Sequence, residues 1–152
     1  MSKNIATSGF YLPLPNSSHE KKAYWFQFDY TDASGTYTLG LPAGTFVEDV
    51  VTQVQPSADF DATSVSLKIG DGDDDDGYMT NAQIALTTAA TATAPVFKHS
   101  AAQSNPYQRG KLYAADDTLD FTWVVGTGGT KGRLVGYVKY SVPGLVDRIP
   151  SS

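Results

Sequence analysis

The sequence contains no cysteine, which excludes disulfide bonds and thiolate metal sites. Charged side chains are also scarce, because Asp, Glu, Lys and Arg make up 18% of the 152 residues, against about 25% in an ordinary soluble domain. The two histidines, His19 and His99, lie in no triad-like, nucleophile-elbow or metal-ligand context, and no phosphate-binding glycine motif is present. The sequence therefore offers few groups for catalysis, and we predict a protein that is not an enzyme.

Long apolar runs are missing as well. Residues 1–18 contain no continuous apolar run of signal-peptide length. The longest uncharged stretch, residues 77–97, consists mostly of Thr and Ala and is interrupted by Asn81, Gln83 and Pro95, so its insertion into a bilayer would be unfavourable. We expect a soluble protein released into the cytosol, with no membrane contact.

The net charge of −5 comes from one segment. Five of the sixteen acidic residues, Asp71, Asp73, Asp74, Asp75 and Asp76, lie in a single predicted loop, and the rest of the chain has 11 acidic and 11 basic residues. Neutralising phosphates requires clustered cations, so a neutral body with scattered Lys and Arg is a poor binder of duplex DNA. Nucleic acid is therefore excluded as the main partner.

What the sequence has in abundance is the two-residue alternation of β-strands. No window of eleven residues keeps the apolar spacing of a helix without Gly, Pro or β-branched runs. The strand alternation occurs in six segments, residues 24–30, 36–41, 46–55, 64–69, 119–125 and 133–140. Turns containing Gly, Pro and Asp separate these segments. With 41% hydrophobic residues, a chain of this length can close one core. We predict an all-β fold, an antiparallel β-sandwich of jelly-roll type, over residues 23–142.

Three details of this prediction concern topology and core. The turn residues 32–35 predict that the first two segments form a hairpin. Gly136, inside the last segment, suggests a β-bulge. The predicted core consists of Tyr24, Phe26, Phe28, Val65, Leu67, Phe121, Trp123 and Val138.

Trp25 is out of phase with the aromatic residues that alternate on either side of it, so it must point to the opposite face of its strand. An exposed ring there would suit stacking on carbohydrate, with Tyr107 or Tyr113 as further stacking surfaces. The alternative, which we favour, is that a partner chain or the N-terminal arm covers Trp25.

Both ends of the chain differ from the predicted body. Residues 1–22 form an N-terminal arm and residues 143–152 a C-terminal tail, because neither offers a strand of useful length. A free tail needs no apolar residues, yet both segments carry several, which indicates contact with the chain's own domain or with a neighbouring chain. The candidate contact residues are Phe10, Tyr11, Leu12, Leu14, Leu145, Val146 and Ile149, together with Trp25.

The acidic segment has a partial likeness to a calcium loop. Asp71, Asp73 and Asp75 match positions one, three and five of the EF-hand, but position six is Asp76 instead of Gly and position twelve is Ala82 instead of Glu. The EF-hand is thereby excluded. Two interpretations remain: a simpler Ca²⁺ or Mg²⁺ loop, and a solvated acidic turn that repels unwanted edge pairing and needs no cofactor. We favour the turn.

A second acidic group precedes the strand at residues 119–125. Asp116, Asp117 and Asp120 lie close together there, and positioned carboxylates are what glycosidases require. Asp in this position is also typical of a turn with an Asx-type hydrogen bond, which we favour over a sandwich hydrolase.

Four stretches, residues 41–51, 64–78, 111–121 and 132–140, occur in an order that resembles small structural proteins of tailed-bacteriophage virions. These are β-sandwich or jelly-roll proteins that decorate the capsid or form head fibres. The resemblance covers residues 36–140 and rests on strand-and-turn patterns; the long acidic turn departs from it.

This resemblance implies a capsid decoration, or cement, protein without enzymatic activity. It implies a homotrimer that is made in the host cytoplasm, sits on the capsid exterior, and binds and stabilises the shell of major capsid protein. The alternative that we keep is a head-fibre, tail-fibre or host-recognition module that binds carbohydrate.

Overall fold

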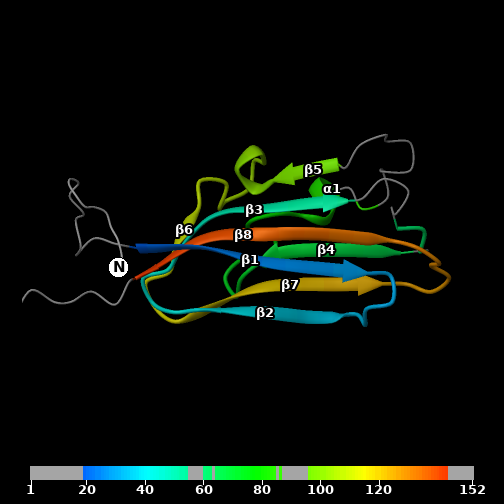
Figure 1. The fold of residues 1–152 in the computed structure, drawn as a ribbon, viewed down its shortest axis with the longest axis horizontal. Helices are drawn as coiled ribbons and strands as arrows, with labels where there is room; N and C mark the ends of the chain where they lie inside the picture. Colours follow the sequence, from blue (N-terminus) through cyan, green and yellow to red (C-terminus); the bar gives the residue numbers. More distant parts are fainter. Residues whose placement is uncertain (1–18, 55–59, 63, 85, 87–95, 144–152) are drawn as a thin grey trace, which may run out of the picture.

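The computed structural model describes residues 19–54, 60–62, 64–84, 86 and 96–143, which form two packed sheets (Figure 1). The larger sheet contains β1 (His19–Asp29), β3 (Phe46–Val54), β5 (Val96–His99), β6 (Lys111–Leu112) and β8 (Arg133–Pro143). The smaller sheet contains β2 (Gly35–Leu41), β4 (Val65–Gly70) and β7 (Asp117–Val125). The described residues also include two short helical segments, α1 (Asn81–Ile84) and a 3₁₀ turn (Ser100–Ala102). No helix among these residues has the length and apolar character needed to cross a bilayer.

All strand pairs of the two sheets are antiparallel. The larger sheet has the order β1-β8-β3-β5, with β6 also paired to β3, and the smaller has the order β2-β7-β4. The predicted all-β antiparallel sandwich is confirmed.

The core lies between the sheets and is built from the alternation that the sequence shows. In β7, Phe121 and Trp123 point inward and are almost fully buried. The Trp123 ring stacks on Phe28 of the facing sheet with ring centroids 5.0 Å apart. Burying a large apolar side chain contributes about 1.5–3 kcal/mol, so these contacts hold the sheets together. Tyr24 departs from the predicted core, because it stays 38% exposed at the side of the sandwich.

The predicted hairpin between the first two strands is wrong. β1 pairs with β8 in the larger sheet, whereas β2 pairs with β7 in the smaller one. Residues 30–34 therefore cross between the sheets. Asp32 fixes this crossing, since its carboxylate accepts the Asp29 N–H at 2.7 Å and its carbonyl accepts the Trp123 Nε1–H at 3.3 Å. Turn chemistry was correctly identified, but it does not determine which strand becomes the partner.

The register shift expected at Gly136 lies elsewhere. β8 stays in register with both neighbours at this residue, and the shift occurs in β3, between Val47 and Asp49. A Cβ at position 136 would stand 2.4 Å from the Phe26 ring and 2.4 Å from the Val51 carbonyl oxygen. The glycine is therefore required because the Phe26 ring lies against the backbone there.

The first and last strands are neighbours, so β1 begins where β8 ends, at one end of the sandwich (Figure 1). His19 lies opposite Pro143 in the register. β1 thus begins inside the predicted N-terminal arm of residues 1–22, and β8 ends on the first residue of the predicted tail. Outside the described residues lie Phe10, Tyr11, Leu12, Leu14, Leu145, Val146 and Ile149.

Candidate functional site

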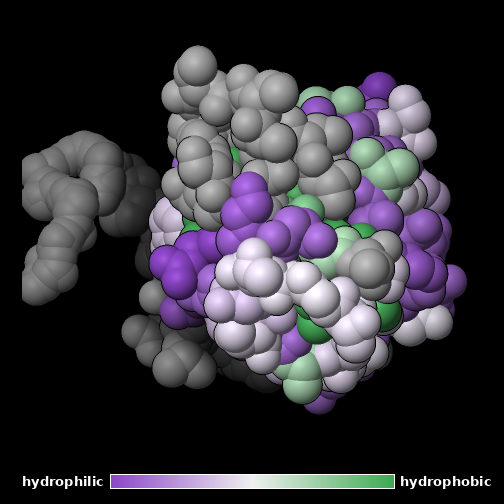
Figure 2. Space-filling model, turned by 90° about the vertical axis from the view of Figure 1, so that its right-hand side faces the viewer, coloured by the Kyte–Doolittle hydropathy of each residue, from purple (hydrophilic) through white to green (hydrophobic). Residues whose placement is uncertain are grey.

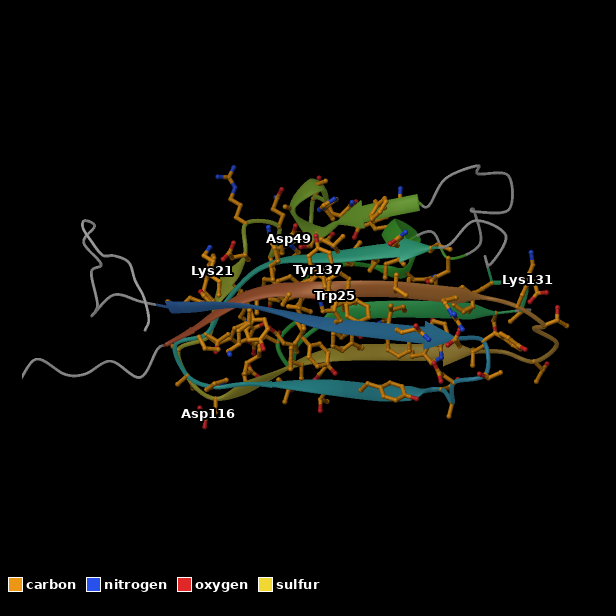
Figure 3. The ribbon with its side chains drawn as sticks, in the orientation of Figure 1. Lys21, Trp25, Asp49, Asp116, Lys131 and Tyr137 are labelled. Atoms are coloured by element: carbon orange, nitrogen blue, oxygen red, sulfur yellow. The ribbon has the colours of Figure 1, made fainter. Side chains whose placement is uncertain are left out.

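An aromatic pair, the exposed Trp25 and the partly buried Tyr137, occupies the outward side of the larger sheet. The two residues are opposite each other on β1 and β8, and their ring centroids are 4.8 Å apart. Trp25 is 67% exposed, as its phase in the sequence predicts. Figure 3 shows the pair near the middle of these strands. A large, rigid aromatic surface that remains in water is typical of a contact site, and we call it the outer aromatic pair.

Ion pairs border the outer aromatic pair along β1. Arg133 Nε lies 2.8 Å from Asp29 Oδ1 near the end of β1, and Lys21 Nζ lies 2.5 Å from Glu48 Oε2 near its start. Exposed pairs of this kind contribute at most about 1 kcal/mol each to stability. Their main effect is that opposite charges neutralise each other beside the aromatic rings, which does not favour a phosphate-rich partner.

Asp49 brings a histidine and a serine together, but not in the order that a catalytic triad needs. Its Oδ2 lies 3.2 Å from His99 Nδ1, and its Oδ1 accepts the Ser100 hydroxyl at 2.8 Å. The serine therefore donates to the carboxylate instead of to the imidazole, so the histidine does not act on it as a base.

A groove runs along the side of the sandwich between β1 and β2, which are edge strands of their sheets in the described part of the chain. Its volume is about 310 Å³. Its polar lining residues are Gln27, Asp32 and Thr38. We call it the aromatic groove after its other residues, Tyr24, Trp25, Phe26, Phe28, Tyr37 and Phe121.

The walls of the aromatic groove are held in place by internal contacts. The Tyr37 hydroxyl donates to the Ala33 carbonyl at 2.8 Å, and its ring packs edge-on against Phe28 with centroids 5.3 Å apart. Phe26 packs on Phe121 with centroids 4.7 Å apart. Because these rings are already ordered, a ligand entering the groove would pay little to organise it.

A shallow hollow lies beside the point where β1 begins and β8 ends. Its residues include Lys21, Glu48, Arg109, Ser141 and Leu112, the last of which is 62% exposed. The opposite end of the sandwich, shown in Figure 2, presents mainly hydrophilic and neutral colours with small hydrophobic areas between them. Leu112 is thus an exposed apolar side chain with charged neighbours, near the end where β1 begins and β8 ends.

Asp71, the first candidate calcium ligand, is the centre of a buried polar cluster. Its Oδ2 accepts Lys111 Nζ at 2.6 Å and the Tyr113 hydroxyl at 2.7 Å. Its Oδ1 accepts the Tyr107 hydroxyl at 3.1 Å and the backbone N–H groups of Asp73 and Asp74 at 3.0 and 3.1 Å. Both carboxylate oxygens are thus occupied by donors of the chain itself.

The electrostatics of this cluster follow from burial and from these hydrogen bonds. Burial on its own would raise the pKa of Asp71, but donation from Lys111, Tyr113 and two backbone amides holds that pKa below its ordinary value. Burial would lower the pKa of Lys111, yet its bonds to Asp71, Tyr107 and Asp73 raise it. The pair is therefore ionised at neutral pH, and it ties the acidic loop to β6.

The remaining acidic residues of the loop sit at the surface. Among the described residues, Asp74, Asp75 and Asp76 form the acidic group in which one carboxylate oxygen from each residue lies within 4.8 Å of the others. It differs from the predicted set of Asp71, Asp73 and Asp75. Burial raises the pKa of Asp76, and the neighbouring Asp74 raises it further. Lys68 Nζ forms an ion pair with Asp75 Oδ2 at 2.6 Å.

The other sequence candidates are placed as follows. Asp116 Oδ1 accepts the Ala43 N–H at 2.9 Å, and Asp117 Oδ1 accepts the Thr118 N–H at 2.8 Å, so both carboxylates bind backbone amides. Tyr113 is 2% exposed, which removes it as a stacking surface. Of the proposed stacking residues, Trp25 is the one on an open face.

Sequence reasoning missed the Asp71–Lys111 pair and the aromatic groove. A signal for the first existed, because the inward alternation of Val65, Leu67 and Ile69 continues to Asp71, which places that carboxylate on the buried face. Its partner Lys111 is 40 residues away and has no local signal. The groove depends on which strands are edges, which the pattern of a single strand does not reveal.

Comparisons with known proteins give likeness in structure only. No protein-family model matches the sequence, and no curated protein matches it. A chain of the cyanophage Pam1 capsid asymmetric unit aligns with a TM-score of 0.57 and 14% identity over 93% of this chain and 99% of that chain. A chain of the Ralstonia phage GP4 capsid aligns with a TM-score of 0.46 and 17% identity over 89% of this chain and 92% of that chain. The Pam1 likeness establishes a shared fold along nearly the full length of both chains.

Proposed function

We propose that this protein is a non-enzymatic structural protein of a bacteriophage virion that decorates the capsid from outside. In this role it binds the major capsid protein as a homotrimer and stabilises the shell after synthesis in the host cytoplasm. The observation that carries the proposal is the fold shared with a chain of the Pam1 capsid asymmetric unit over nearly the full length of both chains.

The arrangement of the chain ends supports this role. Because His19 pairs with Pro143, the apolar residues of the arm and the tail are tethered to the same end of the sandwich. Leu14 is five residues before β1 and Leu145 is two residues after β8. An extended residue spans at most about 3.6 Å, so both can contact one surface within about 20 Å of that end.

Several weak contacts would then act together. A trimer that offers three arms and three tails to one shell makes each later contact at a high effective concentration, so modest individual affinities multiply. Cysteine is absent, and the aromatic core supplies stability without any redox requirement. A particle that must persist outside cells is well served by such a subunit.

The proposal is tested by adding the purified protein to shells of the same phage that lack it and measuring co-sedimentation. We expect saturable binding and a higher melting temperature of the decorated shell. A chain lacking residues 1–18 should keep the β-sheet circular dichroism spectrum but lose shell binding. Full occupancy by the truncated protein would show that the arm is not a contact, and absence of binding by the intact protein would refute the decoration role.

Trp25→Ala tests the outer aromatic pair as a second contact with the shell. Large aromatic contact residues contribute about 2 kcal/mol or more to binding, which corresponds to about 30-fold weaker affinity. Val124→Ala is the matched control, because Val124 is also exposed but belongs to the other sheet. Equal effects of the two substitutions would exclude a specific role of the outer aromatic pair.

Carbohydrate binding in a fibre or host-recognition module is the second candidate function, and the exposed Trp25 ring favours it. A glycan screen distinguishes the two functions. Saturable glycan binding that Trp25→Ala abolishes, without any binding to shells, would replace the decoration role with this one.

A further inference from the structure

Edge strands invite pairing with another chain, and most edges in the described part of this chain are protected against it. In the larger sheet, β1 carries Lys21 and Lys22, while β5 and β6 contain four and two residues. Charged side chains and short lengths are common protections of an edge. In the smaller sheet, residues 78–81 cover β4, because the Ile69 N–H donates to the Met79 carbonyl at 3.0 Å and the Met79 N–H donates back at 3.1 Å.

The edge of β2 has none of these protections. Its seven residues, Gly-Thr-Tyr-Thr-Leu-Gly-Leu, include no charged side chain and no proline, and most of them are exposed. Its pairing with β7 runs through all seven residues without a register shift. On the side away from β7, no described residue forms a hydrogen bond with the backbone of residues 36–40. Among the described strands, β2 is therefore the edge best suited to accept a further strand.

The aromatic groove adjoins this edge and leaves two tyrosine rings partly in water. Tyr37 of β2 is 43% exposed and Tyr24 of β1 is 38% exposed, although both follow the inward alternation of their strands. Tyrosine is enriched in the buried centres of protein interfaces. The Tyr37 hydroxyl already donates to the Ala33 carbonyl at 2.8 Å, so covering its ring would not leave that hydroxyl unpaired. Asp32 is the one charged residue of the groove lining, which favours an uncharged partner strand.

β2 is itself an uncharged strand that fits this edge. In an antiparallel pair, directly opposite residues point to the same face of the sheet, so the inward residues Tyr37, Leu39 and Leu41 must face inward residues of a second copy. A two-fold axis between two copies of β2 must then pass through a residue. With Thr38 on the axis all seven residues pair, whereas an axis through either neighbour pairs only residues 35–39 or 37–41.

The register centred on Thr38 also matches the side chains. Tyr37 lies opposite Leu39 of the second copy in both halves of the contact, and an aromatic ring opposite an aliphatic side chain stabilises an antiparallel pair. On the outward face, Thr36 lies opposite Gly40, which has open space around it. The strand is therefore complementary to itself in the register that pairs the greatest length.

We propose that two copies of this chain associate through β2 and join their smaller sheets into one continuous antiparallel sheet, with a two-fold axis at Thr38. The free backbone groups of each β2 then bind those of the other, and Tyr37 and Leu39 of both copies pack beside the aromatic groove. Such a contact is isologous and joins two protomers. It goes beyond the proposed decoration role, in which it would link neighbouring trimers, and it does not depend on a shell.

Because the chain contains no cysteine, single substitutions test this register directly. Opposite residues of an antiparallel pair have Cα atoms about 4.5–5.5 Å apart, which is within the range of a disulfide bond. Thr38→Cys should therefore form a covalent dimer under mild oxidation. Thr36→Cys and Gly40→Cys should each cross-link poorly alone but efficiently when mixed, because each faces the other. Val124→Cys is the matched control, since Val124 is also exposed but lies on the central strand of the same sheet, and it should remain uncross-linked.

Charge substitutions provide a second readout, by sedimentation velocity of the full-length protein. Thr38→Lys and Thr38→Glu should each self-associate at least 10-fold more weakly than the wild type, because like charges face each other on the axis. A mixture of the two should regain the association, because opposite charges then face each other. The circular dichroism spectra should stay unchanged, since Thr38 is exposed. Val124→Lys and Val124→Glu are the controls and should associate like the wild type.

Three results would overturn the inference. Cross-linking of Thr38→Cys no stronger than that of Val124→Cys would show that the two copies of β2 do not meet. Self-association that neither charge at position 38 weakens would place the contact on another surface. A wild-type protein that stays monomeric at all concentrations would exclude the contact altogether. None of these measurements involves a shell, so failure of the decoration role would leave their outcomes unchanged.

Discussion

Asp71→Asn removes the charge at the centre of the buried cluster while keeping the size of the side chain. The Asp71 side chain is 0% exposed and that of Lys111 is 20% exposed, with 2.6 Å between Nζ and Oδ2. Asparagine would turn an NH₂ group toward donors that now have a carboxylate oxygen. Removing one partner of a buried ion pair costs about 3–5 kcal/mol. Lys111 keeps some hydration and a 3.2 Å contact to Asp73, so we expect the lower end, about 3 kcal/mol.

The matched control is Asp75→Asn. Lys68 Nζ and Asp75 Oδ2 are also 2.6 Å apart, but the two side chains are 40% and 62% exposed. Such a pair contributes about 1 kcal/mol or less. Urea unfolding followed by tryptophan fluorescence measures both changes as shifts of the midpoint at constant slope. Equal losses in the two variants would refute the argument that burial, and not distance, gives the Asp71–Lys111 pair its importance.

The same carboxylate predicts that the stability of the folded protein depends on pH in the acidic range. Although burial opposes it, hydrogen bonding keeps the pKa of Asp71 below that of an unfolded aspartate, about 3.9. Between the pKa of Asp71 in the folded chain and its pKa in the unfolded chain, the unfolded chain binds more protons. The population of unfolded protein therefore rises as the pH falls through this range. The stabilisation is present above about pH 4 and is lost as the pH falls through the folded pKa. Asp71→Asn should flatten this part of the stability profile, and parallel profiles would contradict the assignment.

Three further substitutions separate packing, hydrogen bonding and surface effects. Gly136→Ala should cost about 1–3 kcal/mol in urea unfolding because the added Cβ meets a ring and a carbonyl at 2.4 Å, whereas Gly40→Ala, with open space around it, should be neutral or slightly stabilising. Tyr113→Phe should cost about 1–2 kcal/mol by removing the 2.7 Å bond to Asp71, and a loss below about 0.5 kcal/mol would show that water replaces the hydroxyl. Trp25→Ala should change the unfolding free energy by less than about 1 kcal/mol despite its size, because the ring is mostly in water; a larger loss would mean that it packs on the fold itself.

Strands and their faces were predictable from the sequence because alternation is a local property. The pattern of residues 119–125 placed Phe121 and Trp123 inward, and that of 64–69 did the same for Leu67. Pairing is not local in this sense. Residues 30–34 have the composition of a hairpin turn, yet the strands they join belong to different sheets. A turn sequence permits either outcome, and the choice is made by contacts such as that of Trp123 with the Asp32 carbonyl.

The acidic loop shows a second limit. Counting five aspartates indicated a cation site or a solvated turn, but composition treats all five as equivalent. Asp71 alone continues the inward alternation of β4, and it meets a lysine 40 residues later in the chain. Specific electrostatic roles thus require the fold, since a charge pattern along the chain does not say which carboxylate is buried.

The position of β8 between β1 and β3 has a consequence for biosynthesis. The ribosome makes β1 first and β8 last, so the nascent chain holds β1 without its partner until residue 143 has been added. Contacts between such distant parts of the sequence make folding slow compared with local hairpins. We therefore expect the larger sheet to form only after translation of the body is complete, and a prematurely terminated polypeptide has no central strand with which to join β1 to β3.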